Sequence, residues 1–127
     1  MRPQYHFRDS PQGLRAWSVR RLVELSSDLI PQQVSLSTIR ELDDPFWSGG
    51  KEHPLTCREI AEHARLISES DLSFPIILSS DGRVVDGMHR VCKALNLGRE
   101  TIAAVRLTVD PEPDYIGVHP NDLPYDD

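Results

Sequence analysis

The segment from Pro75 to Leu107 constrains the fold more than any other part of this chain. It begins with an apolar run, continues through a Ser-Ser-Asp-Gly turn, and ends with a β-branched stretch after an apolar helical pattern. The order of these patterns predicts strand, turn, strand, helix and strand, with the strands at 75–78, 83–85 and 101–107 and the helix ending at Gly98. We therefore expect an α/β fold, with a small mixed sheet and surrounding helices.

A candidate anion site lies where the second of these strands meets the helix, at Gly87, His89 and Arg90. Backbone N–H groups at a helix start point outward, and the helix dipole favours an anion there. Glycine lets a ligand approach the backbone, while histidine and arginine supply hydrogen-bond donors for a phosphate. Lys93 follows on the same helix face, either as a further phosphate contact or as a surface lysine. The alternative is a tight structural turn with a solvated arginine.

These residues resemble the ParB/sulfiredoxin superfamily, specifically a ParB N-terminal-like domain. The chain carries Gly87-Met88-His89-Arg90, then an Ala-Leu helix ending at Gly98 and the apolar strand that starts at Thr101. The resemblance implies a ParB/sulfiredoxin-like fold in which the Gly-x-His-Arg turn, Met88 included, binds nucleotide phosphates. In ParB relatives the nucleotide is CTP, and in members that phosphorylate small molecules it is ATP or ADP. Mg²⁺ is a candidate companion ion.

The chain also departs from that family. Met88 stands where sulfiredoxins have their catalytic cysteine, and a thioether cannot act as a thiolate nucleophile. Sulfinic acid reductase activity is therefore not expected. The second ParB motif, which resembles E-N-x-Q-R, is missing, and so is a helix-turn-helix pair, which argues against DNA binding. Catalytic residues stay unassigned, with nucleotide hydrolysis or phosphoryl transfer as the candidate chemistry.

Three further residues are candidates for supporting the phosphate site. Asp86 could hold Mg²⁺ or orient His89, although an N-cap or turn role is equally typical of aspartate. Arg58 and His63 lie on the helix expected from Thr56 to about Ser70 and could reach the phosphate. Their i,i+4 spacing to acidic neighbours also explains them as exposed ion pairs. No H-E-x-x-H or C-x-x-C pattern occurs, so the sequence predicts no zinc site, and no residue is assigned as a metal ligand.

Composition limits the class of protein. The 127 residues carry a net charge of −6, which opposes a general nucleic-acid surface. No apolar run approaches the roughly 20 residues of a membrane span, and the first residues lack a signal-peptide pattern. With two cysteines no disulfide framework is implied, so a cytoplasmic protein is expected.

The remaining sequence suggests three segments: an N-terminal arm and helix at 1–30, the ParB/sulfiredoxin-like domain at 31–109, and an acidic, Pro-rich tail at 110–127. We expect an extended arm to residue 13, a helix over 14–29, and a short strand at 34–36 before a helical turn. Ser37 is expected to cap that turn, which runs through Leu42. Thr56 and Glu59 form a capping box for the following helix, with Ile60, Ala64 and Ile67 facing inward.

The loop at 43–54 carries Phe46, Trp47 and two glycines. Trp47 could stack on a base, bind a protein partner or anchor the loop on the core. The sequence thus favours a nucleotide-binding protein. The alternatives are a non-catalytic protein-interaction module, which would use the Trp47 loop or the acidic tail, and a ParB-like nuclease.

Overall fold

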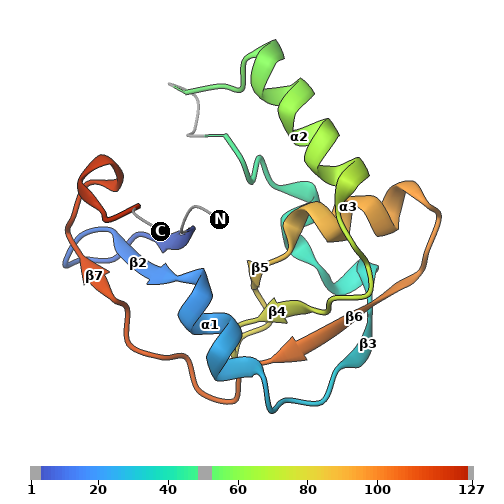
Figure 1. Ribbon diagram of the computed structural model, residues 1–127, viewed down its shortest axis with the longest axis horizontal. Helices are drawn as coiled ribbons and strands as arrows, with labels where there is room; N and C mark the ends of the chain where they lie inside the picture. Colours follow the sequence, from blue (N-terminus) through green and yellow to red (C-terminus); the bar gives the residue numbers. More distant parts are fainter. Residues whose placement is uncertain (1–3, 49–52, 126–127) are drawn as a thin grey trace.

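A computed structural model describes residues 4–48 and 53–125 of this chain. Three parts of the predicted segments lie outside the described residues. They are the first three residues of the arm, the two glycines of the 43–54 loop and the last two residues of the tail. Within the described part, the chain forms two sheets and three α-helices, so the prediction of an α/β fold is confirmed at this level (Figure 1). None of the described helices is long and apolar enough to cross a membrane.

The larger sheet is built mainly by the segment that dominated the sequence. Its strand order is β3-β6-β4-β5, with bounds Gln32–Ser35, Thr101–Arg106, Ile76–Leu78 and Val84–Asp86. β4 pairs parallel with β6, whereas β3–β6 and β4–β5 are antiparallel, so the sheet is mixed as expected. Helix α3, Met88–Asn96, connects β5 to β6.

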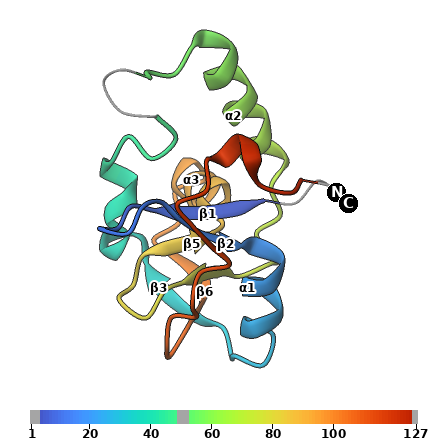
Figure 2. The same ribbon diagram turned by 90° about the vertical axis from the view of Figure 1, so that its left-hand side faces the viewer.

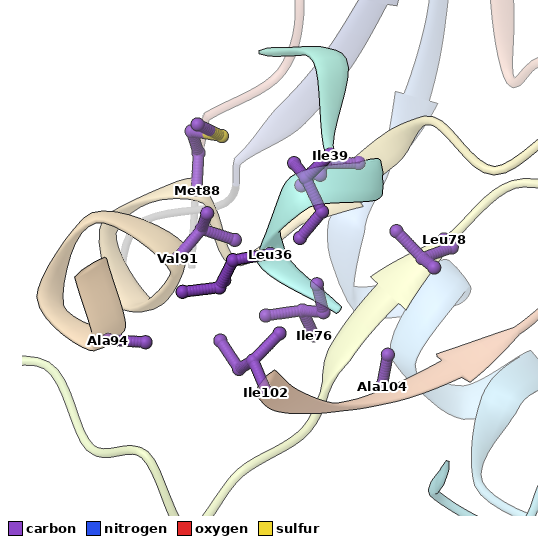
Figure 3. Packing of buried hydrophobic residues seen from close by; sticks show 10 residues of the cluster. Leu36, Ile39, Ile76, Leu78, Met88, Val91, Ala94, Ile102 and Ala104 are labelled. Atoms are coloured by element: carbon purple, nitrogen blue, oxygen red, sulfur yellow. The ribbon is translucent and has the colours of Figure 1, made fainter. Parts of the chain in front are cut away.

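Both faces of strand β4 are buried, which explains its uninterrupted apolar sequence. Ile76 and Leu78 join the core cluster against α3, where Val91 and Ala94 are fully buried (Figure 3). Ile77 points to the opposite face, into a second cluster of residues from the N-terminal segment and the sheet: Trp17, Leu22, Val85, Val105 and Leu107.

The smaller sheet was not expected. Strands β1, Tyr5–Arg8, and β7, Tyr115–Ile116, pair antiparallel with the two edges of β2, Arg15–Ser18. The predicted extended arm and extended tail therefore contribute strands to one sheet, which packs on the rest of the chain (Figure 2).

The prediction of a helix over 14–29 is wrong for its first residues. The structure has β2 there, and helix α1 covers only Val19–Ser26. Ser18 is the N-cap, because its side chain accepts a hydrogen bond from the N–H of Arg21. Ala16 and Trp17 are buried in β2, which pairs with the neighbouring β1 and with the distant β7, and Trp17 Nε1 donates to the Pro111 carbonyl at 2.7 Å. These non-local contacts override the local helical spacing.

A smaller correction concerns the turn after β3. The expected strand at 34–36 ends at Ser35, and short 3₁₀ helices follow at Leu36–Thr38 and Arg40–Asp43. Ser35, rather than Ser37, caps the first of them, since its side chain accepts from the Ser37 N–H. A third 3₁₀ helix lies at Pro120–Asp122.

Helix α2, Cys57–Glu69, begins at Thr56 with both hydrogen bonds of the predicted capping box. Its expected inward face is only partly correct. Ile67 is half-buried, but Ile60 remains 54% exposed and Ala64 is exposed. The reason is visible in Figures 1 and 2, where the N-terminal part of α2 extends beyond the sheets.

Candidate functional site

The strand-to-helix turn depends on Gly87 for a reason internal to the fold. Its φ is +107°, a conformation that strains residues with a side chain. A Cβ at this position would meet Ile76 Cγ2 and Arg90 Nη2, each at 2.7 Å. Packing of the protein itself therefore requires glycine here, whether or not a ligand approaches.

The start of α3 offers backbone donors. Gly87 is its N-cap and makes no side-chain cap hydrogen bond. The first N–H groups of an α-helix have no partner within the helix, so those of Met88, His89 and Arg90 depend on water or a ligand. This arrangement fits the expected anion-binding role of the turn.

His89 lies beside two residues that are distant in sequence. His63 Nδ1 and His89 Nε2 are 2.8 Å apart and share a hydrogen bond between α2 and α3. Both imidazoles stack on Trp47, at centroid distances of 4.3 Å for His63 and 4.7 Å for His89. Because the two imidazole centroids are only 5.1 Å apart, both rings lie on the same face of the indole.

This stack borders an open depression of about 610 Å³, which we call the histidine depression. Its other side comes from β1 and the C-terminal segment. Tyr5 contacts both Phe7 and Tyr125, the latter edge-to-face at 5.3 Å, and its hydroxyl donates to the Pro124 carbonyl. The lining residues are Gln4, Tyr5, Phe7, Trp47, His63, His89, Asn121 and Tyr125.

The histidine pair can present a hydrogen-bond donor or acceptor to a ligand. Burial lowers the pKa of His89 below its usual value, and the neighbouring His63 and Arg90 lower it further. A neutral imidazole has one donor and one acceptor nitrogen, so one ring donates to the other in the pair. Such a pair could donate a hydrogen bond to a bound phosphate or transfer a proton.

Arg90 does not share this depression. Its Nη2 lies 3.1 Å from Asp86 Oδ2 and 3.4 Å from the Pro75 carbonyl. Arg90 and Asp86 line a different depression, together with Pro75 and Phe74, while His89 lines the first. The two basic residues of the Gly-x-His-Arg turn thus diverge, and Asp86 holds Arg90 rather than His89.

The other candidate residues have separate positions. Met88 is buried in the core beside Val91, so its side chain is not at the surface (Figure 3). Lys93 Nζ donates to the carbonyls of Ser68 and Ser70 at 3.0 and 2.7 Å, which satisfies the C-terminal end of α2. Arg58 is exposed on α2 and does not line the histidine depression.

Charged side chains contribute little to the anion site that the sequence leads us to expect here. No lysine or arginine is among its lining residues within the described chain, and His89 favours its neutral form. The described residues also contain no group of three or more His, Cys, Asp or Glu side chains arranged to hold a metal ion.

No family model matches this chain, and no curated protein or solved structure matches it either. The argument for function therefore depends on the geometry of the site. Sequence reasoning found His89 and proposed His63, but it did not place Trp47 beside them. It missed Tyr5, Asn121 and Tyr125 altogether, because no local pattern connects the two ends of the chain to α3.

Proposed function

We propose that this protein binds a nucleotide in the histidine depression, beside the start of α3. One observation carries the proposal: His89, stacked with His63 on Trp47, borders an open depression next to an uncapped helix start. Backbone N–H groups and an imidazole N–H are suitable donors for a phosphate. The resemblance of the Gly87–Arg90 turn to the ParB/sulfiredoxin superfamily supports the same ligand class.

The aromatic residues of the depression suit the rest of such a ligand. Tyr5, Phe7 and Tyr125 supply flat apolar surface, and bases stack on aromatic side chains irrespective of sequence. Asn121, also in the lining, has a side-chain amide that can both donate and accept hydrogen bonds. In this proposal Arg90 shapes the turn through Asp86 and does not contact the phosphate.

Calorimetric titration with CTP, ATP and ADP, with and without Mg²⁺, tests the proposal and selects among the nucleotides. His89→Ala should weaken binding by roughly tenfold or more, the scale of a lost hydrogen bond to a charged group. His53→Ala is the matched control, because His53 is exposed and does not line the depression. Phosphate release measured on the same samples would reveal hydrolysis.

The proposal fails if the wild-type protein binds none of the three nucleotides. It also fails if His89→Ala and His53→Ala bind a nucleotide equally well, since the site would then lie elsewhere. Thermal melts of both variants would separate a loss of contact from a loss of fold.

A protein-interaction module is the second candidate, and one observation favours it. The N-terminal half of α2 has no buried residue, and Ile60 is 54% exposed on it. By contrast, Trp47 packs on the core cluster, and Tyr115 and Ile116 of the tail pair with β2. No observation in the described residues favours a nuclease.

A further inference from the structure

Three arginines from separate parts of the chain surround a second depression, of about 440 Å³, which we call the arginine depression. Arg8 is the last residue of β1, Arg40 begins the second 3₁₀ helix, and Arg83 directly precedes β5. The fold brings them together across more than 70 residues of sequence.

These arginines differ in how firmly the protein holds them. Arg8 donates to His6 Nε2 at 3.2 Å and to Ser79 Oγ at 3.0 Å, and it lies 3.7 Å from Asp81 Oδ1. Arg40 and Arg83 make no side-chain hydrogen bond or ion pair with residues 4–48 and 53–125. The depression therefore combines one anchored guanidinium with two whose donors are available to a ligand.

Two carboxylates also line the arginine depression, Glu41 and Asp44. Glu41 Oε2 accepts a hydrogen bond from the Val84 N–H at 2.6 Å, whereas its buried Oε1 has no hydrogen-bond partner among the described residues. This hydrogen bond links strand β5 to the 3₁₀ helix at Arg40–Asp43. With Asp81 beside Arg8, three carboxylates balance the three guanidinium groups. An anion is therefore favoured by the side-chain donors of Arg40 and Arg83 that no described residue engages, and not by net charge.

His6 lines the arginine depression and adds no charge to it. It lies beside Arg8 and is largely buried, and its pKa is lowered to about 4 by burial and then by Arg8 and Arg83, against a smaller opposite effect of Asp110. The imidazole is consequently neutral at pH 7, so its Nε2 can accept the hydrogen bond from Arg8, and the positive charge among the described lining residues comes from the arginines alone.

The arginine depression adjoins the histidine depression. Phe7 lines both, and Phe46, in the arginine depression, contacts Trp47 edge-to-face at 5.9 Å. Phe7 and Phe46 are 36% and 39% exposed. An anion-binding site next to an aromatic one suits a ligand with a planar ring and several phosphates.

We propose that the arginine depression binds an oligophosphate group. Resting on the proposed function, this assigns the terminal phosphates of the bound nucleotide to Arg40 and Arg83. Arg8 is anchored beside them by Ser79 and His6. The histidine depression then takes the base and the phosphate nearest to it, at His89 and the start of α3, and its lack of lysine or arginine is explained.

The experiment is calorimetric titration of the full chain with sodium tripolyphosphate and, separately, with CTP, ATP and ADP. The Arg40→Ala/Arg83→Ala double variant should bind tripolyphosphate at least tenfold more weakly than wild type, because each guanidinium makes charge-assisted hydrogen bonds. Arg20→Ala/Arg99→Ala is the matched control, since both residues are exposed and line neither depression. It should change affinity by less than about twofold.

The inference is overturned if wild type does not bind tripolyphosphate, or if the two double variants bind it equally. Nucleotide binding that survives in the Arg40→Ala/Arg83→Ala variant at wild-type affinity would also overturn it, while leaving the proposed function intact. If tripolyphosphate binds through these arginines but no nucleotide binds, the anion site is supported and the nucleotide proposal falls.

Discussion

Replacing Gly87 with alanine tests how the fold itself uses the strand-to-helix turn. At φ +107° a side chain costs roughly 1–2 kcal/mol of backbone strain. The added Cβ would also lie 2.7 Å from Ile76 Cγ2, and Ile76 is fully buried, so overpacking adds about 1–3 kcal/mol. We expect Gly87→Ala to lower the free energy of unfolding by about 2–5 kcal/mol, a large share of the roughly 5–15 kcal/mol typical of a domain.

Gly98→Ala is the control for this prediction. Gly98 also has a positive φ, +75°, but no atom lies within 4 Å of a Cβ built there. Gly98→Ala should therefore lose only the free energy of backbone strain. The stabilisation that comes from a less flexible unfolded chain is the same in both variants. Urea denaturation followed by far-UV circular dichroism measures both. If Gly87→Ala loses no more stability than Gly98→Ala, the packing of Ile76 against this turn has been misread.

Two further predictions concern charge. The pKa of His6 is about 4 in the folded protein, below the usual 6.5. As pH falls, His6 is therefore protonated in the unfolded chain before it is protonated in the folded one. The free energy of unfolding should decline by roughly 3 kcal/mol between pH 6.5 and 4. Urea denaturation across this range should give a flatter pH dependence for His6→Gln, and an unchanged slope would contradict the assignment. Arg90→Ala should lower the free energy of unfolding by about 1–3 kcal/mol, because the part-buried Asp86 loses its partner, whereas Arg90→Lys keeps the charge and should lose less. Equal losses in thermal and urea melts would count against the ion pair.

Local sequence signals predicted the central unit well. The turn before β5, the start of α3 at Gly87 and the capping box of α2 each depend on residues within a few positions of one another. Glycine at a positive φ and threonine at an N-cap have the same preferred use in most chains, so their positions indicate structure without knowledge of the fold.

Predictions from the sequence fell short where contacts with other segments decide the secondary structure or the position of a side chain. Ala16 and Trp17 fit a helix by spacing, yet they form β2, because β1 and β7 are available to pair with both edges. For Lys93 the spacing left a phosphate contact and a surface lysine open, and the structure adds hydrogen bonds to the end of α2. Ile60 fits an inward face, yet α2 extends beyond the body of the protein.

The candidate site shows the same division. From the sequence alone came Gly87, His89 and the expectation of an anion at the start of α3. The tertiary structure decided that His63 and Trp47 stack with His89, that Arg90 turns away toward Asp86, and that other arginines gather instead. The physical reason is that the conformational preferences of a few adjacent residues determine a turn. A site, by contrast, is assembled when segments far apart in the chain pack together, and no local sequence pattern shows which segments will meet.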